Sequence, residues 1–382
     1  MTIENIALWA QRKGMDVLAT GDCLQPQWLG QLEASLIEAE PGLYALRPEI
    51  ENAVHARLPK HLHRSLRFVL STEVNCAESL EKEMSGVHQL IYFPCLAEVR
   101  KFAGRISRKG NLQDGRPTLI LTPRDLVRGA ASFDRVHVAA PHAMNPWFSI
   151  LGVVGGGKSA AEIYDDQLPN LWAVETGLTS NPPMCRRVAS LDSHALFSCS
   201  DAHSLENIGR ECTLVDVELS YDSLMQAVRA GSRTAGVVQT YKFPITHTRY
   251  YLNWCSHCQT PFDAWPNCPK CGRRLTIGTR DRLEIIAKDR LKANEPAGAA
   301  PFQELYPLAW VIAGTTGKKP DGRGVRAAAN QMVDQLGSER DILTTIPLAE
   351  LLRVSSPQIA QEIMKQRGGS GSLQLGQSDF DF

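Results

Sequence analysis

The feature that most constrains the fold is a short apolar run that recurs through the first half of the chain. A helix capped by Thr2 and stopped by Gly14 precedes the first run. Stretches with helical spacing, Leu80–Met84, Cys95–Ile106 and Ala160–Tyr164, lie between later runs. This alternation predicts a mostly parallel sheet or a βα barrel. The runs are MDVLAT, RFVLST, VHQLIYF, PTLILT, RVHVAA, LWAV and ALFSCS.

Ionisable residues accompany these runs. A single polar residue after a strand is usually an ordinary loop residue. Several of them, all of metal-ligand or acid-base type, predict a shared metal site, because strand ends converge at one mouth of a βα barrel. His88 differs, since it lies at the start of its run. The residues at the ends of runs are Asp22, Glu73, His142, Glu175, Asp201 and His203.

The cysteines give a second metal prediction. Four of the ten form two Cys-x-x-Cys knuckles, CSHC and CPKC, whose thiolates can bind one tetrahedral ion. The other six are scattered singly, which suits a reducing compartment rather than disulfides. We therefore expect structural zinc bound by Cys255, Cys258, Cys268 and Cys271.

Length and charge set further bounds. The chain has 382 residues, 43% of them hydrophobic, which is enough for two to three domains with a buried core. Lys plus Arg equals Asp plus Glu, at 41 each, so a nucleic-acid surface has to be a local patch. There is no secretory signal and no uninterrupted apolar run of about 18 residues. We expect a soluble, cytoplasmic protein without membrane contact.

The pattern changes after about residue 218. The remainder from Arg280 is polar and helical, and its segment GTTGKKPDGRGVR either meets phosphates or is a solvated loop. The end, LQLGQSDFDF, has the composition of a flexible acidic tail and of short peptides that bind partners such as a helicase or a sliding clamp. The predicted domains are 1–235, a βα barrel; 236–280, a zinc-binding module; 281–367, a helical region; and 368–382, the tail.

The stretch GVVGGGKS, Gly152–Ser159, matches the phosphate-binding loop of many ATPases. That loop needs a strand before it and a helix at its end, and Pro146 stands just before the preceding apolar residues. An ATPase loop and a loop near the metal site that touches a DNA phosphate through Lys158 are the two interpretations. The sequence context favours the second.

Several motifs together resemble the endonuclease Q family of the polymerase and histidinol phosphatase (PHP) superfamily. They are TGDCLQPQWL, STEV, VHQLIYFP, DGRPTLIL, PHAMNPWFS, ETGLTSNP, SDAHSLENIGRE and the paired knuckles. The resemblance implies a distorted βα barrel with two or three divalent ions (Zn²⁺, Mg²⁺ or Mn²⁺). It also implies cleavage of DNA beside a deaminated base, uracil or hypoxanthine, in repair or nucleic-acid defence.

The same resemblance implies roles for individual residues. Glu73 matches a bridging carboxylate, His88 and His142 match histidine ligands, and Asp201 with His203 matches a final Asp-x-His pair. Glu73, Asp201 and His203 are thus the catalytic candidates, and Asp22 and Glu175 join them as metal candidates. An enzyme that acts on one base has to expose it, and aromatic side chains can stack on it, although they can equally be core packing. The substrate-binding candidates are Trp28, Trp147, Phe148, Lys158 and Arg210.

The chain departs from the family pattern near its start. The family opens with a strand carrying His-x-His, whereas this chain opens on the helix, and Gln25 stands where the family has a histidine. The barrel is therefore expected to be incomplete at the N-terminus. The alternative function is a catalytically impaired, DNA-binding relative that docks on a helicase or clamp complex.

Overall fold

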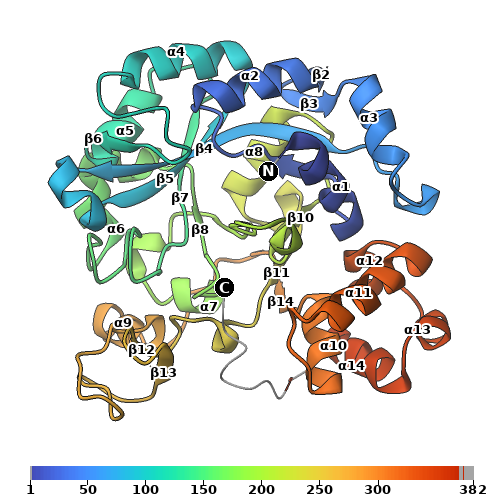
Figure 1. Ribbon diagram of the computed structural model, residues 1–382. Coiled ribbons are helices and arrows are strands. Elements are labelled where there is room, and N and C mark those ends of the chain that lie inside the picture. The colour runs from blue at the N-terminus through green and yellow to red at the C-terminus, as the bar shows by residue number, and fades with distance from the viewer. Residues whose placement is uncertain (1, 370–372, 374–382) are drawn as a thin grey trace.

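A nine-stranded sheet forms the centre of the first two hundred residues (Figure 1). The computed structural model describes residues 2–369 and 373. The strand order is β2-β3-β4-β5-β7-β8-β9, and β1 and β6 both pair with β4. The strands are β1 (Val17–Ala19), β2 (Leu36–Glu40), β3 (Leu43–Leu46), β4 (Arg67–Ala77), β5 (Val87–Phe93), β6 (Thr118–Ile120), β7 (His137–Ala140), β8 (Ala173–Glu175) and β9 (Leu196–Phe197).

The sheet is mixed, so the expectation of a mostly parallel sheet is wrong. The β4–β5 and β5–β7 ladders are antiparallel, whereas β7–β8 and β8–β9 are parallel. The reason is the length of β4, which runs past Glu73 to Ala77 before a 3₁₀ turn, η2 (Leu80–Ser85), reverses the chain. Glu73 therefore lies within a strand, opposite Leu90 of β5. In the described part of the chain the ladders form an open path from β2 to β9.

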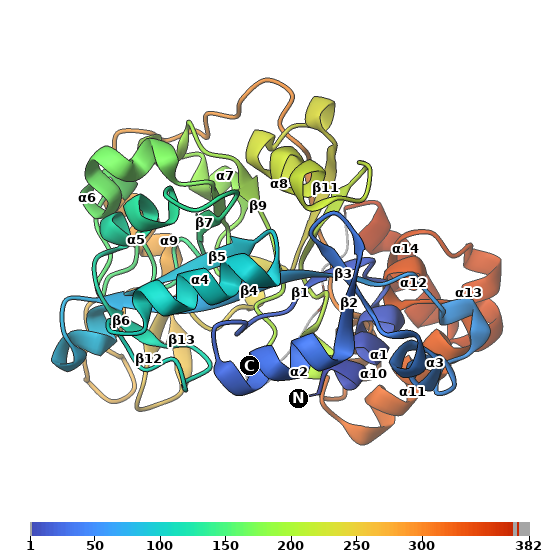
Figure 2. The ribbon, with the colours of Figure 1, turned by 90° about the horizontal axis from the view of Figure 1, so that it is seen from above.

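The helix predicted after Thr2 and the predicted stretches Cys95–Ile106 and Ala160–Tyr164 form α1, α4 and α6, whereas Leu80–Met84 lies in the 3₁₀ turn η2. In α1 the Thr2 hydroxyl accepts the Asn5 N–H at 3.4 Å, and Gly14, at φ 80°, ends the helix in the left-handed region. Figure 2 shows α4 lying over β4 and β5, and the Phe102 ring of α4 lies 5.4 Å from that of Phe93. The helices of this half are α1 (Ile3–Lys13), α2 (Pro26–Ser35), α3 (Pro48–His55), α4 (Leu96–Ile106), α5 (Pro123–Ala130), α6 (Ala160–Tyr164), α7 (Pro182–Cys185) and α8 (Tyr221–Ala230).

The second half begins with a three-stranded sheet of β10 (Cys212–Val215), β11 (Val237–Lys242) and β14 (Phe302–Glu304). Between β11 and β14 the chain makes a two-stranded hairpin and one helix. They are β12 (Asn253–Cys255), β13 (Thr260–Phe262) and α9 (Thr279–Ile286). Strand β14 lies inside the range predicted to be helical, 281–367, because it pairs in parallel with β11.

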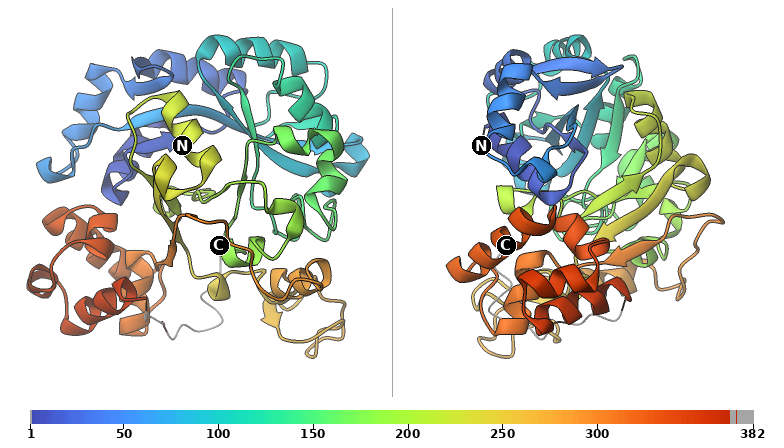
Figure 3. Two further views of the ribbon diagram at one scale, coloured as in Figure 1. Left: turned by 180° about the vertical axis from the view of Figure 1, so that it is seen from behind. Right: turned by 90° about the vertical axis from the view of Figure 1, so that its right-hand side faces the viewer.

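The last helices form a cluster that contacts α1. They are α10 (Leu308–Thr316), α11 (Arg323–Leu336), α12 (Glu339–Thr344), α13 (Leu348–Val354) and α14 (Pro357–Arg367). Figures 1 and 3 show this cluster and the β12–β13 hairpin apart from one another at the end of the molecule opposite α4. The predicted domain boundaries stay a prediction.

Two predictions concern regions at the limits of the structure. The tail expected to bind a helicase or clamp lies outside the described residues, except for Gly368, Gly369 and Leu373. Among the described residues, no helix is long and apolar enough to cross a membrane.

Candidate metal centres

The four knuckle cysteines come together as predicted. The Sγ atoms of Cys255 and Cys271 are 3.6 Å apart, and those of Cys258 and Cys268 are 3.9 Å apart. Thiolates bound to one zinc ion at about 2.3 Å in tetrahedral geometry stand about 3.8 Å from one another. The donor set and its spacing therefore fit a zinc ion.

A second ligand group lies on the main sheet. Glu73 Oε1 in β4 is 3.1 Å from His142 Nε2 and 3.3 Å from His88 Nδ1, and the two ring nitrogens are 3.2 Å apart. Ligand atoms about 2.1 Å from one ion, with angles of about 90–110°, stand about 3.0–3.4 Å from one another. Glu73, His88 and His142 therefore fit one divalent ion. Within the described residues, this group and the cysteines are the sets of three or more candidate ligands that lie close enough together.

Burial and charge act against each other in this group. Burial raises the pKa of the Glu73 carboxyl, but hydrogen bonds from His142 and His88 outweigh it and hold that pKa well below 4.5. Burial lowers the pKa of His142, but the charge of Glu73, with those of Asp201 and Glu175, raises it overall. For His88, burial prevails and its pKa is lowered. The group thus has an ionised carboxylate facing two histidine rings.

The chain around the predicted site carries backbone strain. The described residues include seven non-glycine positions with positive φ, and four of them are candidates predicted from the sequence. Such conformations cluster at functional sites, where the surroundings fix them. The four are Asp22 (φ 46°), His142 (33°), Phe148 (59°) and Asp201 (42°).

Other predicted ligands lie outside this group. The side chain of Asp201 is 36% exposed and that of His203 72%, with 3.7 Å between Asp201 Oδ1 and His203 Nδ1. Partial burial of the Asp22 carboxyl, together with the charge of Glu73, raises its pKa, against the opposing charges of Arg116 and His203. The charges of Glu73 and His203 thus act on Asp22. The assignment of Asp22, Asp201 and His203 as metal ligands stays a prediction.

Glu175 has a different environment. Its side chain is 1% exposed, and its oxygens accept the backbone N–H groups of His142 and Gly177, each at 2.7 Å. Burial raises its pKa.

The aromatic candidates differ in how they are engaged. The Phe148 ring stacks on His88, with centroids 4.5 Å apart. Trp147 packs edge-on against Tyr250 at 4.7 Å, and the Trp28 indole N–H donates to the Gly21 carbonyl at 3.0 Å. All three residues are half-buried, so part of each side chain packs against the protein and part remains exposed.

Gln25 has a structural role in this chain. It is the N-cap of α2, and its side-chain oxygen accepts the N–H of Trp28 at 2.5 Å. Its amide nitrogen donates to the Gln113 carbonyl at 3.3 Å, which ties α2 to the loop that carries Arg116.

The glycine-rich loop does not have the context of a phosphate-binding loop. No strand directly precedes Gly152–Ser159, and α6 after it has five residues. The Lys158 N–H is bonded to the Glu162 carboxylate at 2.9 Å. The loop carbonyls of Leu151, Gly152 and Gly157 accept from the Arg282 guanidinium of α9 at 2.9, 3.2 and 2.8 Å.

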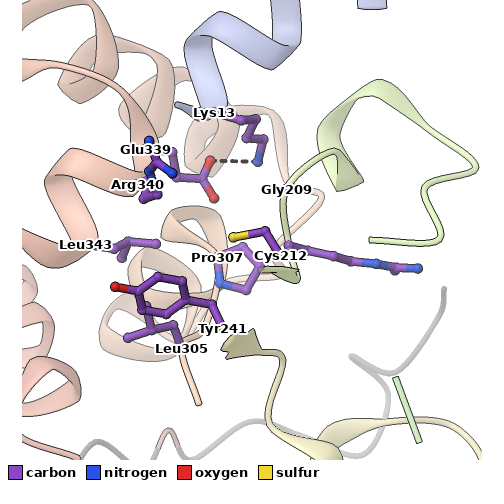
Figure 4. Close-up of a pocket in the computed structure, with 10 residues that line it drawn as sticks. Lys13, Gly209, Cys212, Tyr241, Leu305, Pro307, Glu339, Arg340 and Leu343 are labelled. Carbon is purple, nitrogen blue, oxygen red and sulfur yellow. Dashed lines mark hydrogen bonds and ion pairs between the residues drawn. The ribbon is translucent and has the colours of Figure 1, made fainter. Parts of the chain in front are cut away.

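Arg210 contacts Asp201 and also lines a pocket. The buried guanidinium donates to the carbonyls of Ser200 and Asp201 at 2.8 and 3.0 Å. It also lines a small pocket of about 30 Å³ between α1, β10–β11 and α12, where Lys13 pairs with Glu339 at 2.6 Å (Figure 4). None of Glu73, His88 and His142 lines this pocket, so it is separate from the metal-ligand group.

Several neighbours of the site were not predicted from the sequence. Arg116 Nη1 donates to Glu73 Oε2 at 3.2 Å, and its side chain is 42% exposed. Lys242 and Glu211 form a fully buried ion pair next to Gly177. Arg116 lies in the quoted DGRP motif, which was a usable signal, whereas Lys242 and Arg282 lie far in sequence from the residues they contact.

The fold and site together define a mixed α/β chain with a carboxylate–imidazole ligand group and a separate four-cysteine site. No family model matches the chain. "Uncharacterized protein YqxK" of Bacillus subtilis is 26% identical over 381 residues, which cover 98% of this chain and 90% of the relative.

Two solved structures are similar over nearly the whole chain. The lesion-specific endonuclease PfuEndoQ from Pyrococcus furiosus has a TM-score of 0.79 at 25% identity, covering 98% of this chain and 89% of that one. Endonuclease Q in complex with a 27-mer duplex substrate with an abasic lesion at the active site has a TM-score of 0.81 at 25% identity, covering 98% and 90%. The predicted resemblance to endonuclease Q is therefore confirmed.

Proposed function

We propose that this chain is a metal-dependent, PHP-type DNA endonuclease that nicks DNA next to deaminated bases, uracil or hypoxanthine, in DNA repair or nucleic-acid defence. The observation that carries the proposal is the Glu73–His88–His142 group, whose ligand atoms lie within 4.8 Å of one another. It lies on a fold similar to that of a lesion-specific endonuclease.

In this proposal Glu73, His88 and His142 hold a divalent ion. Such an ion lowers the pKa of a bound water and stabilises charge on phosphate oxygens. Arg116, beside Glu73 and half-exposed, provides a guanidinium that can bind a backbone phosphate. Asp201 and His203 are accessible to substrate and serve as further ligands or as proton-transfer groups.

Recognition of a single altered base requires that the base leaves the stack. We assign base contacts to Trp28 and Trp147, which are half-buried. Phe148 already stacks on His88, so its contribution is to hold that ring. Lys158 is exposed and Arg210 is buried against Asp201, so Lys158 is the better placed of the two to reach a phosphate.

The test is a nicking assay on labelled duplexes that contain one deoxyuridine, one deoxyinosine, one abasic site or no lesion. We expect cutting only at lesions, only with Mg²⁺, Mn²⁺ or Zn²⁺, and none with Asp201→Ala. Cutting of undamaged duplex at the same rate, or cutting that survives Asp201→Ala, contradicts the proposal.

The alternative is a DNA-binding relative that cuts weakly or not at all and docks on a helicase or clamp. The observation that favours it is Gln25, which caps α2 where a histidine could have offered a metal ligand. Lesion binding without nicking, with one ion beyond the knuckle zinc by elemental analysis, supports this alternative. Gln25→His restoring cutting would trace the impairment to that position.

A further inference from the structure

The backbone of His142 is held in an unfavourable conformation. Its φ of 33° lies in the left-handed region, which side chains other than glycine rarely adopt. Such a residue keeps this conformation only when its surroundings over-determine it. The contacts that hold it therefore decide where the His142 ring points.

The first of these contacts is the buried carboxylate of Glu175, at the end of β8. Oε2 accepts the His142 N–H and Oε1 accepts the Gly177 N–H, both at 2.7 Å, and the Glu175 backbone carbonyl accepts the Ala143 N–H at 3.0 Å. Gly177, at φ 69°, passes so close that a Cβ there would lie 2.6 Å from His142 Cα. Glu175 thus joins two segments that no larger residue at position 177 would allow to meet.

Lys242 of β11 holds in turn the segment that carries Glu175. The ammonium group of Lys242, which is fully buried, donates to the Gly177 carbonyl at 2.5 Å and to Thr176 Oγ1 at 2.9 Å, and it pairs with Glu211. Glu211 in turn accepts the Phe243 N–H at 2.9 Å. Lys242 therefore fixes the 175–177 segment that carries Glu175.

Apart from Glu73 and His88 of the ligand group itself, the His142 ring has no hydrogen-bond support among the described residues. A metal-binding histidine is usually oriented by a hydrogen bond from its second ring nitrogen. The second nitrogen of His142, Nδ1, is buried and has no hydrogen-bond partner among the described residues. Outside the ligand group, its orientation therefore has to come from the backbone.

We propose that Glu175, supported by Lys242, is a positioning residue that aims the His142 ring at Glu73, and not itself a metal ligand. The inference rests on the proposed function in one respect, that Glu73, His88 and His142 bind a divalent ion.

The experiment measures Mn²⁺ binding by the full chain, with its cysteine-bound zinc kept, from the electron paramagnetic resonance of free Mn²⁺. The variants are Glu175→Gln and Lys242→Met, at a temperature where each is folded by circular dichroism. Glu339→Gln is the matched control, because Glu339 also pairs with a lysine and accepts a backbone N–H, from Leu308 at 3.2 Å, but lies away from the site.

We expect the Mn²⁺ affinity of Glu175→Gln to fall by about 10- to 100-fold, the usual effect of losing a group that orients a ligand. The Mn²⁺ affinity of Lys242→Met, which removes a group that cannot be a ligand, should fall as well. Glu339→Gln keeps the wild-type affinity even if its melting temperature falls. A wild-type affinity in Lys242→Met, or an equal loss in Glu339→Gln, overturns the inference.

A metal-free crystal structure of Glu175→Gln separates this inference from the proposed function. We expect His142 to leave the left-handed region and its Nε2 to move away from Glu73. If His142 keeps its place there, Glu175 does not position it and the inference is wrong. If the wild-type chain binds no Mn²⁺, the proposed function fails and this structure alone decides the inference.

Discussion

The two candidate metal sites are built in opposite ways. The cysteine site takes all its ligands from 255–271, around the β12–β13 hairpin, and its small core consists largely of the cysteines themselves. The Glu73–His88–His142 group draws on β4, β5 and the loop after β7, and its geometry depends on Glu175, Lys242 and Phe148. The first site is a local structure, whereas the second is held by the fold around it.

Removing a cysteine should therefore have the largest effect. We expect Cys268→Ser to lose the zinc ion and to destabilise the C-terminal half by about 5 kcal/mol or more, because structural zinc binding is largely folding free energy. Elemental analysis and denaturant unfolding measure the two quantities. Cys95→Ser, at a cysteine outside the cluster, is the control and should keep both zinc and stability. Full zinc content in Cys268→Ser would remove the contrast between the sites.

The Glu73 group should show a smaller and pH-dependent effect. In the metal-free protein we expect Glu73→Gln to cost about 2 kcal/mol, since two hydrogen bonds to a charged group are lost. The lowered pKa of Glu73 makes its contribution present above about pH 4.5 and lost as the pH falls through the folded-state value. The raised pKa of His142 makes its contribution present below about pH 6.5 and lost as the pH rises through its folded-state value.

The difference in unfolding free energy between wild type and Glu73→Gln should therefore be largest between these two limits. Urea unfolding from pH 3 to pH 9, with a chelator to keep the Glu73 group free of divalent ions, tests this. A difference that stays constant over the whole range would mean that the three side chains do not interact through charge.

The same contrast explains what could be predicted from the sequence. The knuckles repeat one spacing, and α1 carries its cap and stop in its own residues, so both were predicted from local pattern alone. The direction of β5 was not, because it depends on a 3₁₀ turn of polar residues after β4 that has no strong turn signal. Lys242 and Arg282 were missed because their partners lie at least 31 positions away, and neither is part of a periodic pattern.

The two sites are also connected. Arg282 of α9 follows the cysteine module and donates to three carbonyls of the loop that begins near Phe148. We expect Arg282→Met to cost about 1–2 kcal/mol, since loop carbonyls lose their donors, and to weaken Mn²⁺ binding slightly through Phe148 and His88. Arg280→Met on the same helix is the control, because its partners are Asp263 and Asp281. Equal effects of both variants on Mn²⁺ binding would show that the link is not specific to the loop.

The smallest effect is expected at Lys158, in the loop between the two sites. Its side chain is exposed and its backbone N–H is already bonded to Glu162, the position that a phosphate would take in an ATPase loop. Lys158→Ala should therefore change stability by less than about 0.5 kcal/mol, as surface substitutions usually do. If Lys158 meets a DNA phosphate, duplex binding weakens equally with and without a lesion, and the slope of log affinity against log salt falls by about one. Nicking should not depend on ATP in either protein. ATP hydrolysis by the wild type that Lys158→Ala abolishes would instead make Gly152–Ser159 a nucleotide site, and would add a third centre to the two compared above.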